Sequence, residues 1–261
     1  MPRLSLDCLT LTDTAPDQLV RAAAGAGFDL VSLWVAPPIF PRQGLSPANC
    51  DAVAAAMAET GIGVHVLEVF DLVSDEVLEG YRPALELGAG LGGKVATAIH
   101  MTNPDRTDAV RLLRRFAGIA AEYGLGVGLE PIVVGETRTL AEGAALIAEA
   151  GIDAGLTFDF LHLMRCGGSA GDVRAIDPAL IRYVQVCDGK LSVPPEYLEV
   201  EGALLRLFPG EGEFPIAELL AAAPEHAIIG VECPNLARIQ AGADPIDLAH
   251  EAMAAIRAFI G

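Results

Sequence analysis

Cysteine is sparse in this 261-residue sequence, and its spacing excludes two common uses of the residue. The five cysteines are dispersed, odd in number and include no Cys-x-x-Cys pair. This pattern predicts neither a disulfide framework nor a zinc site made of thiolates. Cys8, Cys187 and Cys233 fall in or beside expected strands, where we interpret them as small buried apolar side chains.

Long uncharged apolar runs are also missing. The first residues contain no extended apolar core of the kind that signal peptides have. No later segment approaches the roughly 20 apolar residues of a membrane span. We therefore expect a soluble, cytoplasmic protein that has no membrane partner.

Basic residues are few, since 17 lysines and arginines face 35 aspartates and glutamates and give a net charge of −18. Proteins that bind nucleic acids gain affinity by neutralising phosphates with Lys and Arg, so we expect no nucleic-acid partner. A small anionic substrate is compatible with this charge, because a few local arginines can reverse the potential inside a cleft.

The sequence does contain a repeated alternation of apolar runs and Ala/Leu-rich helical stretches. Runs rich in Val and Ile recur about eight times, which predicts parallel strands covered on both faces. Because one TIM barrel typically has about 250 residues, we predict a single α/β domain over residues 1–261, a (β/α)8 barrel. A doubly wound open sheet is the alternative, but no G-x-G-x-x-G follows the first strand. The expected strands are 4–8, 29–35, 62–70, 93–99, 126–130, 154–159, 182–187 and 227–232.

Helix start signals support this division. Ser46-Pro47 and Asp244-Pro245 each place a capping side chain before a proline, as at the first turn of a helix. Thr139 and Glu142 have the spacing of a capping box. We expect helices to begin at these three places.

Residues 188–213 interrupt the alternation with a segment rich in Pro, Gly and Glu. Segments of this length inside a compact domain are usually lids or binding loops. This one follows the seventh strand, and barrel active sites lie at the carboxyl ends of the strands. Arg206 in this segment and Arg165 after the sixth strand are candidates to bind a substrate carboxylate or phosphate. We prefer Arg206, because a lid could carry it to the site.

Four consecutive expected strands end in a polar side chain: Glu130, Asp159, Gln185 and Glu232. Side chains at matching heights on neighbouring barrel strands converge on the barrel axis. Three close carboxylates cannot all stay ionised without a cation. The sequence therefore predicts a divalent-metal site made by these four residues.

These residues lie in segments that resemble the xylose isomerase-like barrel superfamily, the sugar phosphate isomerase/epimerase group, over essentially the whole chain. The resemblance implies the same four ligands, with Glu130 and Glu232 also moving the proton next to a substrate carbonyl through an ene-diolate. The segments that carry it are Leu129-Glu130-Pro131, Phe158-Asp159-Phe160-Leu161-His162, Val184-Gln185-Val186-Cys187-Asp188, Pro209-Gly210-Glu211-Gly212-Glu213 and Val231-Glu232.

Gln185 departs from the pattern, because most members of the superfamily have His there. Hydroxypyruvate isomerase-like members also carry Gln, so the change is compatible with a metal site. An amide in place of imidazole makes all four ligand atoms oxygen, which favours Mn²⁺ or Mg²⁺. Zn²⁺ and Co²⁺ are the alternatives.

The resemblance also implies residues that contact substrate. His162 completes the family's Asp-x-x-His, and Glu136 stands where sugar epimerases keep a glutamate that touches substrate hydroxyls. Glu68, which ends the third strand, is a further polar candidate, and Trp34, which ends the second, could form an apolar wall for a sugar.

The function expected is therefore isomerisation or epimerisation of a small keto sugar, a sugar acid or hydroxypyruvate. A dehydratase of a cyclic keto-polyol or of 3-dehydroshikimate, using the same proton abstraction, is the first alternative. An endonuclease IV-like phosphodiesterase and a non-catalytic binding protein are further alternatives. Many barrels of this group are homodimers or homotetramers, and the sequence favours neither.

Overall fold

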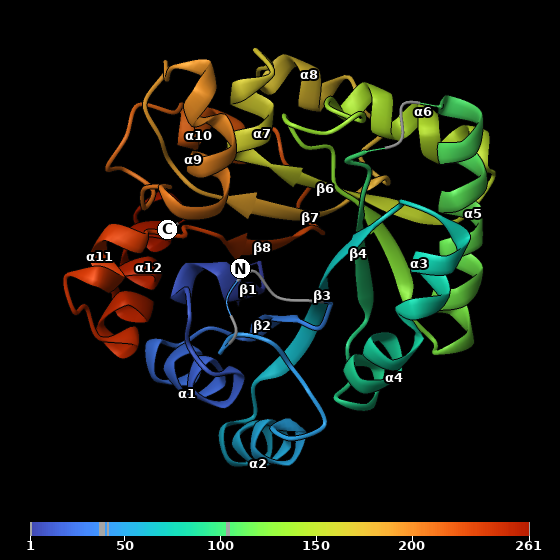
Figure 1. Ribbon diagram of the computed structural model, residues 1–261. Coiled ribbons are helices and arrows are strands. Elements are labelled where there is room, and N and C mark those ends of the chain that lie inside the picture. Colours follow the sequence, from blue (N-terminus) through green and yellow to red (C-terminus); the bar gives the residue numbers. More distant parts are fainter. Residues whose placement is uncertain (1, 37–39, 41, 103–104, 261) are drawn as a thin grey trace.

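Eight parallel strands close into a barrel in a computed structural model that describes residues 2–36, 40, 42–102 and 105–260 (Figure 1). Each strand pairs with the next in the chain, and β1 pairs with β8. The predicted TIM barrel is confirmed, and the open sheet is excluded because the first and last strands are hydrogen-bonded. The strands are β1 Leu4–Leu6, β2 Leu30–Trp34, β3 Gly63–Asp71, β4 Val95–Ile99, β5 Gly126–Leu129, β6 Ala154–Asp159, β7 Ile181–Val186 and β8 Ile228–Val231.

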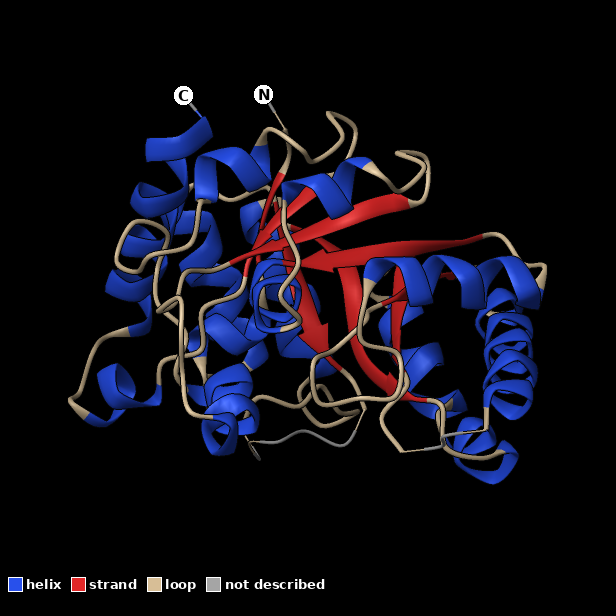
Figure 2. Ribbon diagram, turned by 90° about the horizontal axis from the view of Figure 1, so that it is seen from above, coloured by secondary structure: helices blue, strands red, loops and turns tan. Residues whose placement is uncertain are grey.

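Helices surround the strands, which lie inside the molecule when it is seen from above (Figure 2). The strands are therefore covered on both faces; every residue of β2 and of β6 is buried. The helices are α1 Pro16–Ala26, α2 Cys50–Thr60, α3 Asp75–Gly80, α4 Arg82–Gly90, α5 Arg106–Glu122, α6 Leu140–Ala150, α7 Phe160–Arg165, α8 Ala170–Arg174, α9 Leu198–Leu204, α10 Ile216–Leu220, α11 Leu236–Gln240 and α12 Pro245–Ile260, with 3-10 turns η1 Cys8–Leu11 and η2 Pro195–Tyr197.

Two of the three predicted helix starts are confirmed. Thr139 caps α6 with a reciprocal capping box to Glu142, and α12 begins at Pro245. The prediction at Ser46-Pro47 is wrong, because α2 begins only at Cys50. The side chain of Asn49 accepts the Ser46 amide hydrogen at 2.8 Å, which stabilises a turn at Ser46 in place of a first helical turn.

The segment at residues 188–213 is more ordered than a loop, since it contains η2 and α9. The Asp188 carboxylate, itself buried, accepts backbone N–H groups of Gly210, Gly212 and Phe214, each at 2.9 Å. These bonds fold the end of the segment back onto its beginning. Among the described residues no helix is long and apolar enough to cross a membrane.

The capping box gives a test of local stability. Replacing Thr139 with Ala removes the hydroxyl that accepts the Glu142 amide hydrogen, and we expect it to lower the free energy of unfolding by about 1 kcal/mol in urea titrations. Thr107→Ala, at an exposed position in the first turn of α5, should change it by less than about 0.5 kcal/mol. Equal effects of the two substitutions would contradict a capping role for Thr139.

Candidate functional site

The carboxyl ends of β5 to β8 bring the four predicted ligands to one end of the barrel. Asp159 and Gln185 are direct partners across β6 and β7, and Gln185 is level with Gly230 of β8. The backbone amides of Glu130 and Glu232 continue the pairing, to Ala98 at 2.9 Å and to Val186 at 3.1 Å. All four side chains are buried. The barrel register therefore determines that these groups share one edge.

A cavity of about 240 Å³ opens at this end of the barrel. Among the described residues its lining has four acidic side chains, including Glu199 of α9, together with Arg206, His162 and apolar groups from the loops and from α9. The polar lining residues predicted from sequence are Glu68, Glu130, His162, Arg206 and Glu232, with Trp34 among the apolar ones.

Arg206 lies between two of the predicted ligands. Its Nη1 is 2.6 Å from Asp159 Oδ2 and 2.9 Å from Glu232 Oε2, and the side chain is 3% exposed. Its Nε donates to the Gly202 carbonyl of α9 at 2.8 Å. Arg206, which we expected a lid to carry to the site, therefore lies at the acidic centre. Two carboxylates and one backbone carbonyl hold its guanidinium there.

Gln185 and His162 complete the surroundings of the carboxylates. Gln185 Nε2 donates to Glu232 Oε1 at 3.0 Å, while Gln185 Oε1 has no hydrogen-bond partner within the described ranges. His162 Nε2 lies 3.7 Å from Glu130 Oε1, and the backbone amide of His162 donates to Asp159 Oδ1 at 2.9 Å. One ligand atom each from Glu130, Asp159 and His162 lie within 4.8 Å of one another.

A second acidic group combines Glu68 and Glu232, both predicted from the sequence, with Asp7, which the sequence analysis missed. Asp7, which follows β1, approaches Glu68 of β3 and Glu232, with one oxygen of each within 4.8 Å of the others. Asp7 and Glu68 are 0% and 3% exposed. The signal available was the position of Asp7, directly after a strand at the height of the other ligands.

Burial dominates the acid–base behaviour of these carboxyls. Burial raises the pKa of Asp7 to about 7 and that of Glu232 to about 8, although Tyr183 and Arg206 respectively oppose the change. Burial and the nearby Glu232 raise the pKa of both Glu68 and Glu130 well above the usual range. Burial therefore favours the protonated forms of these carboxyls unless a cation replaces the protons.

The pKa values of Asp159 and His162 are lowered, in contrast to those of the other carboxyls. Burial disfavours the Asp159 carboxylate, but Arg206 and His162 outweigh it and hold its pKa below the ordinary value. Burial lowers the pKa of His162 to about 4, so its imidazole is neutral at physiological pH. A neutral imidazole with Nε2 beside Glu130 can accept or donate a hydrogen bond, or ligate a metal.

Two of the predicted substrate-binding residues lie outside the cavity lining. Glu136 is exposed on the loop after β5, where its backbone amide donates to the His100 carbonyl at 2.8 Å. Arg165 forms a buried ion pair with Glu201 of α9 and also donates to the Lys190 carbonyl at 2.8 Å. Both contacts of the Arg165 guanidinium are to residues of the 188–213 segment. Arg165 therefore stabilises this segment and does not line the cavity.

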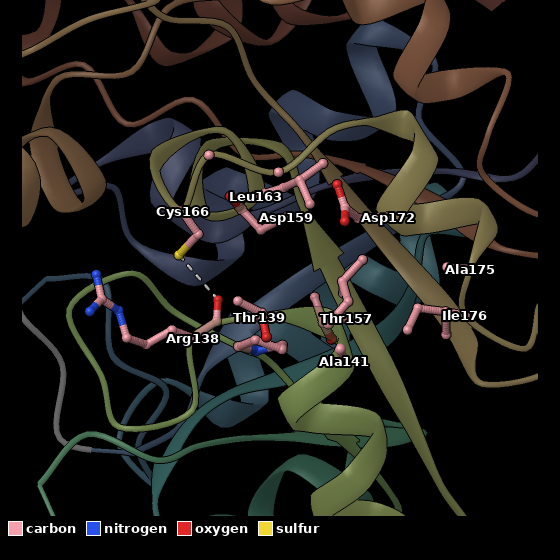
Figure 3. A pocket seen from close by; sticks show the side chains of 14 residues that line it. Arg138, Thr139, Ala141, Thr157, Asp159, Leu163, Cys166, Asp172, Ala175 and Ile176 are labelled. Carbon is pink, nitrogen blue, oxygen red and sulfur yellow. Dashed lines mark hydrogen bonds between the residues drawn. The ribbon is translucent and has the colours of Figure 1, made fainter.

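A separate cavity of about 320 Å³ lies between the start of α6 and the α7–α8 connection (Figure 3). Its lining includes Thr139, Cys166 and Asp172, and the Cys166 thiol donates to the Arg138 carbonyl at 3.3 Å. Only Asp159 is shared with the predicted site. The convergent polar groups are at the other cavity, which is therefore the candidate active site.

The residues present fit a divalent cation. The buried carboxylates of Glu130, Asp159 and Glu232 and the Gln185 Oε1 atom supply oxygen donors. A rotation of the Gln185 amide by 180° would exchange the positions of its oxygen and nitrogen. In the part of the chain that the structure describes, a single guanidinium contacts Asp159 and Glu232, which leaves negative charge to be balanced when all the carboxyls ionise.

The raised pKa of Asp7 predicts a pH dependence of stability. Its carboxyl ionises near pH 3.8 when exposed but only near pH 7 in the fold, so the folded state binds the extra proton and stability falls as pH rises through this window. For metal-free protein we expect Asp7→Asn to reduce this loss, by up to roughly 1.4 kcal/mol per pH unit. Urea titrations between pH 4.5 and 7.5 measure the slope.

The control for that experiment is Glu196→Gln, which removes the same charge from an exposed position. It corrects for the general effect of the large negative charge of the protein. If Asp7→Asn and Glu196→Gln gave the same slope, the folded-state proton would not reside on Asp7.

Comparison with solved structures shows the same barrel in proteins of low sequence identity. A fusion protein of a xylose isomerase-like TIM barrel with 4-hydroxyphenylpyruvate dioxygenase is 22% identical, with a TM-score of 0.82 over 97% of this chain. The match spans 42% of the fusion protein, so this chain corresponds to less than half of that protein's length.

Two further structures match along nearly all of both chains. The IolI protein with a bound zinc atom is 18% identical, with a TM-score of 0.77, over 99% of this chain and 96% of IolI. D-allulose 3-epimerase from Methylomonas sp., in complex with D-allulose, is 20% identical, with a TM-score of 0.73, over 99% and 97%. No curated protein matches the sequence significantly. The model of the xylose isomerase-like TIM barrel family matches residues 20–259, and the chain therefore belongs to that family.

Proposed function

We propose that this protein is a divalent-metal-dependent isomerase or epimerase of a small keto sugar, sugar acid or hydroxypyruvate-like substrate. The observation that carries the proposal is the placement of two buried carboxyls, Glu130 and Glu232, in the lining of one cavity. A pair of this kind can remove a proton from one carbon and return it to the same or a neighbouring carbon.

Glu130, Asp159, Gln185 and Glu232 would hold the metal, and their oxygen donors favour Mn²⁺ or Mg²⁺ over Zn²⁺. The bound cation would polarise the substrate carbonyl and acidify the adjacent C–H. The family resemblance and the zinc in the related IolI structure support a metal at this position.

The chain's own residues would perform the proton transfer. Burial and neighbouring carboxyls raise the pKa of Glu130 and Glu232, which favours the protonated form of each. Arg206 carries a positive charge into the cavity and can bind a substrate oxygen or carboxylate in addition to Asp159. His162, neutral and next to Glu130, can hydrogen-bond a substrate hydroxyl.

The size of the cavity supports a small substrate. Its volume of about 240 Å³ is below the roughly 300–1,000 Å³ of sites for drug-sized ligands. The lining divides into apolar side chains, among them Trp34 and Ile132, and polar side chains, among them Glu130 and Arg206. A compound of a few carbons with several oxygens fits this division better than an extended polymer.

A dehydratase is the second candidate, favoured by Glu68. This carboxyl lines the same cavity, and burial raises its pKa well above the usual range, which favours its protonated form. An acid in that position could protonate a departing hydroxyl after the first proton is removed. Isomerisation, epimerisation and dehydration therefore share the first step.

The shared step is tested by proton exchange in D2O. We expect Mn²⁺-loaded protein to introduce deuterium next to the carbonyl of at least one member of a panel of ketoses, hydroxypyruvate and cyclic keto-polyols, followed by NMR. Glu130→Gln and Glu232→Gln should each slow the exchange by about 100-fold or more. Glu196→Gln, exposed on the 188–213 segment, should not.

The products decide the class of reaction. A ketose with its carbonyl moved indicates isomerisation, an inverted centre indicates epimerisation, and an enone that absorbs ultraviolet light indicates dehydration. Absence of exchange in every compound, with stoichiometric metal bound, would contradict the proposal and favour a binding or hydrolytic protein.

A further inference from the structure

We propose that Asp7, Glu68 and Glu232 form a second site for a divalent cation, next to the one proposed above. Asp7 directly follows β1, Glu68 lies within β3 and Glu232 directly follows β8, whereas the first site uses the ends of β5 to β8. The inference rests on the proposed function only through Glu232, whose carboxylate the two sites would share.

The spacing of the carboxylates suits one ion. One oxygen from each of Asp7, Glu68 and Glu232 lie within 4.8 Å of one another. Oxygens that bind a common Mg²⁺, Mn²⁺ or Ca²⁺ ion on opposite sides are about 4–5 Å apart. Only small side-chain movements are therefore needed for all three to bind the same cation.

The hydrogen bonds of this group leave one oxygen free on each of two carboxyls. Asp7 Oδ1 accepts hydrogen bonds from Ser5 Oγ at 2.9 Å and from the Tyr183 hydroxyl, and Glu68 Oε2 accepts one from the Cys8 thiol at 3.3 Å. Asp7 Oδ2 and Glu68 Oε1 are fully buried, and neither has a hydrogen-bond partner among the described residues. Buried acceptors without a partner are uncommon and costly, which points to a group that binds them.

No charge of the opposite sign compensates this pair. Over the part of the chain that the structure describes, neither Asp7 nor Glu68 forms an ion pair. Arg206 contacts Glu232, and its remaining close carboxylate is Asp159. Two buried carboxylates without a counter-ion are stable only with protons or with a cation between them.

Gly230 makes room for this arrangement. It is level with Ser5 on β1 and with Gln185 on β7. A Cβ at this position would lie 2.5 Å from Asp7 Oδ2 and 2.5 Å from the Tyr183 hydroxyl oxygen. A side chain here would push the Asp7 carboxylate away from the cluster, so the glycine keeps the barrel axis open for it.

The donors define the class of ion. All three side chains offer carboxylate oxygens. Hard oxygen donors favour Mg²⁺, Mn²⁺ or Ca²⁺ over Zn²⁺. Two cations joined by the Glu232 carboxylate would form a two-metal centre, which can hold two adjacent substrate oxygens.

Metal stoichiometry tests the second site without reference to activity. The full chain is equilibrated with Mn²⁺ at pH 8 and physiological salt, which screens weak surface binding, and bound metal is measured by elemental analysis. We expect about two Mn²⁺ ions per wild-type chain and a spin-coupled EPR signal from the shared carboxylate. Asp7→Asn and Glu68→Gln should each bind about one ion and lose the coupled signal.

Asp159→Asn is the matched variant for the first site and should also retain about one ion, bound at the second site. If Asp7→Asn fails to fold, as judged by circular dichroism, Glu68→Gln and the wild-type EPR signal decide the question. One ion per wild-type chain, abolished by Asp159→Asn but not by Glu68→Gln, would overturn the second site and leave the proposed function intact. Two coupled ions without deuterium exchange would support the second site and contradict the proposed function.

Discussion

The rest of the structure depends on how this barrel stabilises carboxyl groups that are buried on its axis. Asp7, Glu68, Glu130, Asp159 and Glu232 are all less than one-tenth exposed. Transferring ionised groups from water into such surroundings is costly unless opposite charge or hydrogen bonds compensate it. The Arg206 guanidinium compensates two of them directly, and its position between Asp159 and Glu232 organises that side of the centre.

The requirement for Arg206 explains the architecture of the segment after β7. Asp188 folds the segment by accepting the backbone N–H groups of Gly210, Gly212 and Phe214, and the Arg165–Glu201 ion pair joins α9 to α7. The Arg206 amide donates to the Pro234 carbonyl, close to Glu232. These contacts hold the guanidinium at the acidic centre without relying on substrate, so positioning Arg206 is part of the folded structure.

The family fold and the chemistry of the centre are separate properties. Barrels of this shape support many reactions, and the reaction is determined by side chains at the strand ends. Here the polar groups extend around the axis to Asp7 and Glu68, beyond the four strand ends that the family pattern covers. Protons, Arg206 and cations can all balance these carboxyls, and the site's behaviour with pH and metal follows from the competition among them.

The sequence alone determined the barrel and the location of most of the site, because both follow from local patterns. Apolar runs of strand length define parallel strands, and a polar residue at the end of each run must face the same mouth. The tertiary structure decided which side chains meet. Asp7 and Glu68 are 61 residues apart in the sequence and lie in one cluster. Arg165 forms an ion pair with Glu201, and Glu136 is exposed outside the cavity. Such pairings depend on barrel closure and side-chain direction, which no local pattern encodes.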